Sequence, residues 1–70
     1  MTDEKELILS ELRRVRAMLF KNEQLFEFAE DDAETEALIY ENRALNIRYS
    51  SLIRKAKDAG IREEELLWRK

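Results

Sequence analysis

The sequence predicts an all-α protein: an antiparallel, coiled-coil-like hairpin of two helices with a short C-terminal helical tail. The 70 residues include no proline and one glycine, and 41% of them are charged, a composition typical of long helices. Two segments place apolar residues at alternating steps of three and four, the heptad spacing of helices that pack against each other. An acidic cluster separates the two segments and predicts the turn. We therefore expect one domain over residues 1–70.

The first helix is predicted over residues 3–29. Asp3 stands at its expected N-cap, and Glu6 follows three residues later, which is the spacing of a capping box. Heptad steps connect one stripe of residues along this helix. This stripe, the first seam, consists of Ile8, Leu12, Val15, Leu19, Asn22, Phe26 and Ala29.

The turn is predicted over residues 30–32. Asp31 or Asp32 can cap the helix that follows, because an aspartate side chain accepts hydrogen bonds from the free N–H groups of a first helical turn. Glu34 follows Asp31 at the spacing of a capping box.

The second helix is predicted over residues 33–59. It ends before Gly60, the only glycine, because the residue after a helix often takes the left-handed conformation that glycine favours. The second seam consists of Thr35, Leu38, Asn42, Leu45, Tyr49, Leu52, Ala56 and Ala59.

The two seams match when the chain folds back on itself. Facing residues of an antiparallel hairpin have a constant sum of residue numbers, and a sum of 64 pairs Leu12 with Leu52 and Asn22 with Asn42. The two amides of the seams then share one layer. A buried Asn pair sets the register of a coiled coil at some cost in stability, so we expect Asn22 and Asn42 to form a register-setting polar layer.

The tail, residues 60–70, is predicted to form one or two further helical turns. Ile61 directly follows the glycine and is expected to pack back onto the last turn of the second helix. Leu66, Leu67 and Trp68 are then placed to cover the open end of the hairpin. The alternative is that Trp68 is a binding hot spot, a role in which tryptophan is enriched.

A second stripe on the second helix predicts self-association. It continues at heptad steps through Ala37, Tyr40, Ala44, Ile47 and Ser51. With the off-seam apolar residues of the first helix, this outer stripe exceeds what one hairpin can bury. We expect a homodimeric four-helix bundle, with the outer stripe and Trp68 at interfaces. The sequence leaves open which stripe packs within the chain and which between chains.

Charge is sorted along the chain. Residues 12–22 carry four positive charges and residues 42–57 carry five, with no acid in either run, whereas residues 23–41 carry eight acids and no base. In a hairpin the two basic runs lie side by side and the acids surround the turn. We expect the basic residues to form one band, the basic belt, that binds an anionic surface: Arg13, Arg14, Arg16, Lys21, Arg43, Arg48, Arg54, Lys55 and Lys57.

The composition argues against catalysis. The chain has no cysteine and no histidine, which excludes thiol chemistry and removes the commonest general base and metal ligand. We therefore expect a non-enzymatic protein with no metal and no cofactor. The longest apolar run, residues 17–20, is far too short to cross a membrane, and no signal peptide precedes the helical pattern. We expect a cytoplasmic protein without membrane contact.

Residues 38–61 resemble the YaaL-like family of small bacterial helical proteins. The matching residues are Ile39, Tyr40 and Glu41, the pairs Ala44-Leu45 and Arg48-Tyr49, Leu52, and the run Arg54-Lys55-Ala56-Lys57. The resemblance implies a small cytosolic bacterial protein of unknown function. It transfers no catalytic or ligand-binding residue.

Two functions remain open from the sequence. The first is an adaptor: a homo-oligomeric helical hairpin that presents a surface to a protein partner whose identity the sequence does not reveal. The second is nucleic-acid binding through the basic belt. In a third arrangement, the acidic turn of one molecule docks on the belt of another, and the charge sorting then serves assembly alone.

Overall fold

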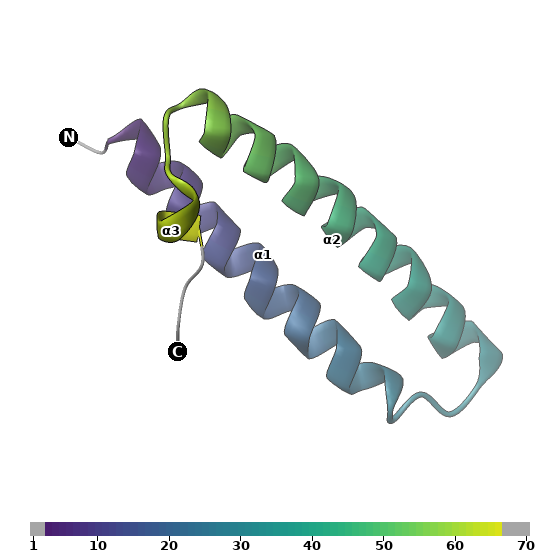
Figure 1. Cartoon of the computed structure of the whole chain (residues 1–70). Helices are drawn as coiled ribbons and strands as arrows, with labels where there is room; N and C mark the ends of the chain where they lie inside the picture. Colours follow the sequence, from purple (N-terminus) through teal and green to yellow (C-terminus); the bar gives the residue numbers. More distant parts are fainter. Residues whose placement is uncertain (1–2, 67–70) are drawn as a thin grey trace.

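The computed structural model describes residues 3–66 as two long antiparallel helices and one short helix (Figure 1). Helix α1 spans Glu4–Phe26, α2 spans Asp32–Asp58, and α3 spans Glu63–Leu66. The long helices pack side by side, and residues 3–66 contain no strand. The prediction of an all-helical, two-helix hairpin is therefore confirmed.

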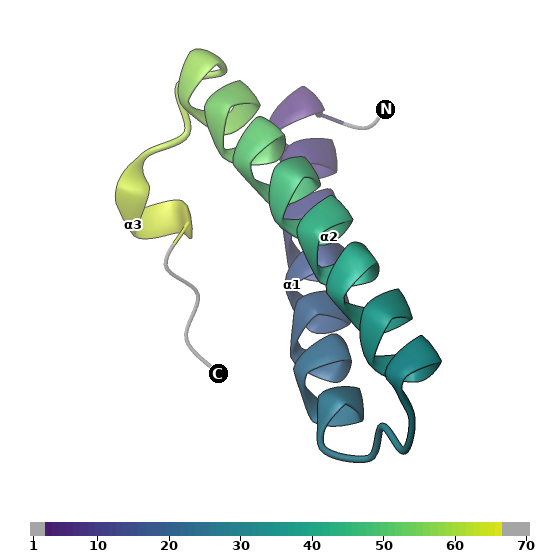
Figure 2. The same cartoon turned by 90° about the vertical axis from the view of Figure 1, so that its right-hand side faces the viewer.

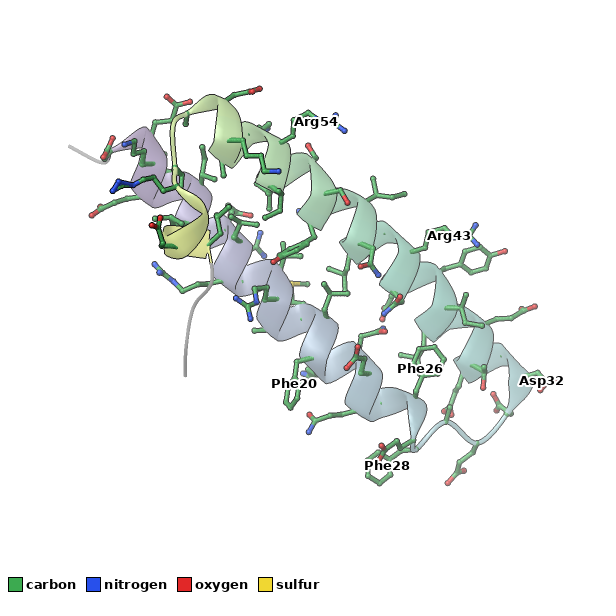
Figure 3. All side chains as sticks on the ribbon, viewed as in Figure 1. Phe20, Phe26, Phe28, Asp32, Arg43 and Arg54 are labelled. Atoms are coloured by element: carbon green, nitrogen blue, oxygen red, sulfur yellow. The ribbon has the colours of Figure 1, made fainter. Side chains whose placement is uncertain are left out.

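The two seams form the contact between α1 and α2. Every residue of both seams is buried or half-buried, whereas all five residues of the outer stripe are exposed. Asn42 Nδ2 donates a hydrogen bond of 3.0 Å to Asn22 Oδ1, so this layer has the register expected from the sequence. The phenyl ring of Phe26 points between the helices, while Phe20 and Phe28 point away (Figure 3). The structure thus decides which stripe packs within the chain.

The apolar core lies at the open end of the hairpin, away from the turn. Its buried residues are Ile8, Leu12, Ala56, Ile61 and Leu66. Leu9 of α1 and Ile53 of α2 pack partly buried against this cluster. These two residues adjoin the seams on one side of the hairpin, and α3 lies beside the long helices on that side, which we call the tail flank (Figure 2).

Gly60 turns the chain from α2 into the tail. Its φ angle of 81° lies in the left-handed region, which glycine adopts without steric cost. The Gly60 N–H donates to the Lys57 carbonyl at 3.0 Å, and the Ile61 N–H donates to the Ala56 carbonyl at 2.9 Å. This pair of bonds is a Schellman motif. The motif directs Ile61 back onto the core, as the sequence predicted.

The cap of α2 begins at Asp31, whose side chain accepts a hydrogen bond of 2.8 Å from the Glu34 N–H. The Glu34 carboxylate accepts a bond of 2.8 Å from the Glu30 N–H, one residue earlier than in a capping box. The expected cap of α1 is not formed: Asp3 is the N-cap residue, but its side chain makes no capping hydrogen bond. Glu6, its expected partner, is exposed.

Helix α1 is shorter than predicted, because it ends at Phe26 and the connection to α2 covers residues 27–31. The carbonyl of Leu25 accepts a hydrogen bond from Phe28, three residues later, which is a tight turn and not an α-helical bond. The last turn of α1 contains no basic residue, and acids at a helix C-terminus are unfavourable to the helix dipole. This charge pattern favours an early end.

Candidate functional site

The flank opposite the tail carries a chain of three shallow hollows, and we call it the groove flank. Small residues of α2 line all three hollows: Ala37 near the turn, Ala44 in the middle and Ser51 toward the open end. Leu25 borders both the first and second hollows, and Ala44 borders both the second and third. The hollows therefore form one continuous groove between α1 and α2.

Exposed apolar side chains of α1 and of the connection after it form the other wall of the groove. Met18 and Leu25 are each 43% exposed, and Phe28 is 73% exposed. Leu38 and Leu45, which belong to the second seam, line the hollows beside them and are only half-buried. Contiguous apolar surface of this kind typically marks a protein contact.

Charged residues border the same groove in a fixed order along α2. Glu34 and Glu41 line it near the turn, whereas Arg48 and Lys55 line it near the open end. All four lie on the groove flank at heptad spacing, one position before the seam residues. This row was not predicted from the sequence, although the charged residues one position before the seam residues indicate it.

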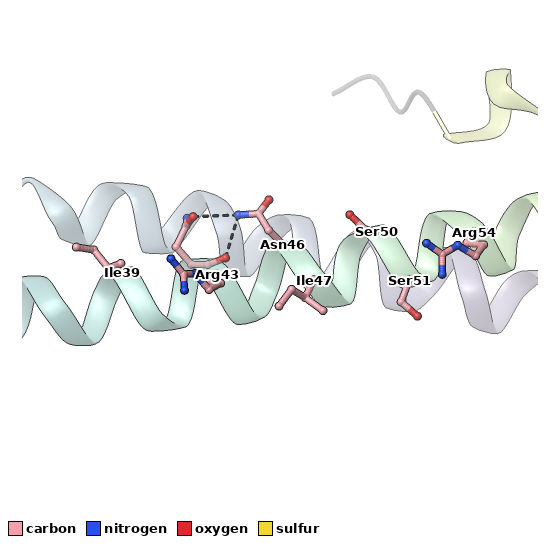
Figure 4. A pocket seen from close by; sticks show the side chains of 8 residues that line it. Ile39, Arg43, Asn46, Ile47, Ser50, Ser51 and Arg54 are labelled. Atoms are coloured by element: carbon pink, nitrogen blue, oxygen red, sulfur yellow. Dashed lines mark hydrogen bonds between the residues drawn. The ribbon is translucent and has the colours of Figure 1, made fainter.

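A second surface is the outer face of α2, where a shallow groove runs along the helix (Figure 4). Arg43 and Arg54 project from this face, away from α1 (Figure 3). Between them, Asn46 and Ser50 point to the side on which α3 lies, and Ile47 and Ser51 point to the other (Figure 4). Ile47 is 67% exposed, so an apolar side chain stands between two cationic ones.

The basic belt surrounds the hairpin and does not form one face. Arg14 pairs with Glu11 at 2.9 Å, and Arg13 and Arg16 are engaged in interactions within the protein. Lys21 shares the middle hollow with Glu41. Arg43 and Arg54 lie on the outer face of α2, and Arg48 and Lys55 lie on its groove flank. Lys57 is exposed and lines neither surface.

The polar layer is larger than the sequence predicted. Asn22 is 3% exposed, and its Nδ2 donates to the Leu38 carbonyl at 3.3 Å and to the Glu41 carboxylate at 3.5 Å. Asn46 Nδ2 donates to Oδ1 of Asn42 at 2.9 Å. Asn46 was not expected here, although its position four residues after Asn42 places both on one side of a helix. The third amide extends the network from the seam to the outer groove of α2.

The other predicted interface residues have mixed positions. Tyr40 is 69% exposed on α2. Leu66 is buried in the core as predicted, whereas Leu67 and Trp68 lie outside the described residues. Within residues 3–66, no group of three or more acidic, cysteine or histidine side chains could hold a metal ion, and no helix is long and apolar enough to cross a membrane.

Comparisons with known proteins add no relative: no family model, no curated protein and no solved structure matches this chain. The resemblance of residues 38–61 to the YaaL-like family therefore stays a prediction.

Proposed function

We propose that this protein is a non-enzymatic interaction module that works as a homodimer, in which two hairpins join along their groove flanks into a four-helix bundle. The single observation that carries the proposal is the continuous groove, whose walls include Met18, Leu25 and Phe28 with large exposed fractions. The tail flank has α3 over its open end, whereas no element among residues 3–66 covers the groove flank.

The size of the molecule supports this reading. Its extents are 44 × 23 × 23 Å, so one flank offers about the 800 Å² per partner that a standard protein interface buries. A chain of 70 residues also gains limited stability from a single small core. Dimerisation would bury the half-exposed seam residues near the turn and supply the missing apolar contacts. As an adaptor in the bacterial cytoplasm, the dimer would present its outer α2 faces to a further protein.

Sedimentation equilibrium over protein concentrations from about 0.1 to 100 µM tests the proposal. We expect twice the monomer mass at the upper end, with helical circular dichroism throughout. Leu25→Glu should weaken the dimer, because it places a charge against an apolar surface. Ile39→Glu, on the outer groove of α2, is the matched control and should leave the dimer intact. A folded wild-type monomer at all concentrations would contradict the proposal.

Nucleic-acid binding is the second candidate, and the outer face of α2 favours it. Arg43 and Arg54 flank this groove without an acid among its lining residues, and neither forms an ion pair with the part of the chain that the structure describes. Because the basic belt encircles the hairpin, a nucleic acid on one face would meet only some of its members. The adaptor therefore remains the first proposal.

A titration with labelled single- and double-stranded oligonucleotides at about 50 mM salt tests this candidate. Binding to phosphates should weaken steeply as salt rises, because condensed counterions are released on binding. Replacing both Arg43 and Arg54 with Gln should reduce the slope of log affinity against log salt concentration by about two. Lys21→Gln, on the groove flank, should not change that slope. Absence of binding at this salt concentration would remove the candidate.

A further inference from the structure

We infer that the partner on the groove flank is a second copy in an antiparallel, two-fold arrangement. In this head-to-tail arrangement, α2 packs against α2 of the second copy, and each Ala44 lies nearest its own counterpart. This inference rests on the proposed function and specifies its geometry. It follows from the order of side chains along the groove flank of α2, from the acidic turn at one end of the hairpin, and from the small residues in the hollows.

The groove flank of α2 presents seven positions at heptad steps: Glu34, Ala37, Glu41, Ala44, Arg48, Ser51 and Lys55. Small and charged residues alternate along this row. The two charges on the turn side of Ala44 are negative, and the two on the open side are positive. The row is therefore antisymmetric in charge about Ala44.

An antisymmetric row complements itself only when a second copy runs in the opposite direction. With Ala44 on the two-fold axis, Glu41 faces Arg48 of the second copy, and Glu34 faces Lys55 of the second copy. Ala37 and Ser51 of the second copy then share one layer. A parallel, in-register pairing would instead place each charge beside its like, which is unfavourable.

The small residues allow this contact to be close. The distance between packed helices depends on the side chains at the contact, and Ala37, Ala44 and Ser51 carry at most two side-chain heavy atoms each. A close α2–α2 approach also brings the charged side chains that flank Ala44 within reach of each other. Exposed pairs of this kind contribute little singly, so their main effect is to select the direction.

The two ends of the hairpin favour the same direction. Eight acids lie between residues 23 and 41, and the acid-free basic runs lie in residues 12–22 and 42–57. The alternative four-helix bundle packs α2 against α1 of the second copy and puts both turns at one end. That arrangement gathers the acids of both turns at one end of the bundle, whereas the antiparallel arrangement places the two acidic turns at opposite ends.

Cysteine cross-linking tests the geometry without ambiguity, because the chain contains no cysteine. A disulfide needs Cα atoms within about 7 Å. Ala44→Cys should therefore form a covalent dimer under mild oxidation, and Ser50→Cys, also exposed but on the tail flank, should not. A mixture of Lys21→Cys and Ala44→Cys proteins probes the alternative bundle, in which these positions face each other. Heterodimers of that mixture, without Ala44–Ala44 cross-links, would overturn the inference.

Charge exchange provides the second readout. Arg48→Glu should weaken the dimer about tenfold, because it replaces two attractive pairs with two repulsive ones. Adding Glu41→Lys to Arg48→Glu should restore the dimer affinity. Arg43→Glu, the same change on the outer face, should leave the wild-type affinity unaltered. Equal effects of Arg48→Glu and Arg43→Glu, or no rescue by a double exchange that keeps the thermal stability of the hairpin, would overturn the geometry. A dimer that persists in sedimentation would then still support the proposed function, whereas a wild-type monomer would remove both.

Discussion

The two ends of the hairpin use the same seam pattern but bury it to different degrees. At the open end, Leu12, Val15 and Ala56 have no exposed surface. At the turn end, Phe26 and Leu38 hold equivalent seam positions and are only half-buried. The one buried seam residue in that half is the polar Asn22.

The difference arises from a third element. Ile61 and Leu66 fold back over the open end and exclude water from the side of the seam, whereas no residue of the described chain does so near the turn. Two helices enclose a line of contact but not a volume, so their seam residues stay open on both flanks. We propose that a second copy, bound on the groove flank, completes the core of the turn end.

The largest effect is expected from Leu12→Ala, which should lower the free energy of unfolding by about 2–5 kcal/mol because it leaves a cavity in the closed part of the core. Leu38→Ala, the same change at a half-buried seam position of the turn end, should cost less, about 1–2 kcal/mol. Urea denaturation followed by circular dichroism measures both. Equal costs would break the comparison between the two ends.

The polar layer should respond differently to single and double substitution. Asn22→Leu alone or Asn42→Leu alone should cost about 1–3 kcal/mol, because the remaining amide loses its buried partner. The double variant should melt at or above the wild-type temperature, with looser control of register or oligomeric state. A double-mutant cycle from thermal denaturation measures the coupling, and strictly additive effects would contradict contact between the two amides.

Gly60→Ala isolates the contribution of the tail connection at the open end. An added Cβ would meet nothing within 4 Å, so the expected loss of about 1–2 kcal/mol comes from the left-handed backbone alone. Because the same glycine directs Ile61 to the core, proteolysis of the tail should accelerate. Unchanged stability and protease resistance would show that the open end tolerates another connection.

The smallest contrast is between the two helix caps. Asp31→Ala should cost about 1 kcal/mol, because it removes the acceptor of the Glu34 N–H. Asp3→Ala should stay within about 0.5 kcal/mol, since the Asp3 side chain makes no capping bond. Thermal unfolding of both variants makes the comparison, and an equal loss would mean that Asp3 caps α1 in solution.

Much of the fold could be predicted from local pattern. Heptad spacing selected the residues of both seams, Asp31 and Gly60 marked the limits of α2, and the Asn pair indicated the register that the hydrogen bond between Asn22 and Asn42 shows. Each of these signals depends on residues within a few turns of one another or on the matching of two regular repeats. The end of α1 was predicted three residues too late, because seam spacing continues through Ala29 although the chain has already turned.

Less of the candidate site could be predicted from the sequence. The basic belt was predicted as a band around the hairpin, but the sequence did not indicate that Arg43 and Arg54 lie on one surface of α2 and Arg48 and Lys55 on another. The role of Asn46 was not predicted either, because Asn46 lies outside the seam and joins the polar layer only through Asn42. Charge order along the chain indicates which residues are basic, but only the positions of both helices indicate which of them share a surface.

The sequence by itself thus determined the helices, their antiparallel pairing and the layer that aligns them, because these depend on periodicity and on short-range hydrogen bonds. The tertiary structure alone decided which stripe is intrachain, which flank α3 covers and which flank stays open as a groove. Periodicity alone does not distinguish two amphipathic stripes on one helix. They become different only when a neighbouring helix excludes water from one of them.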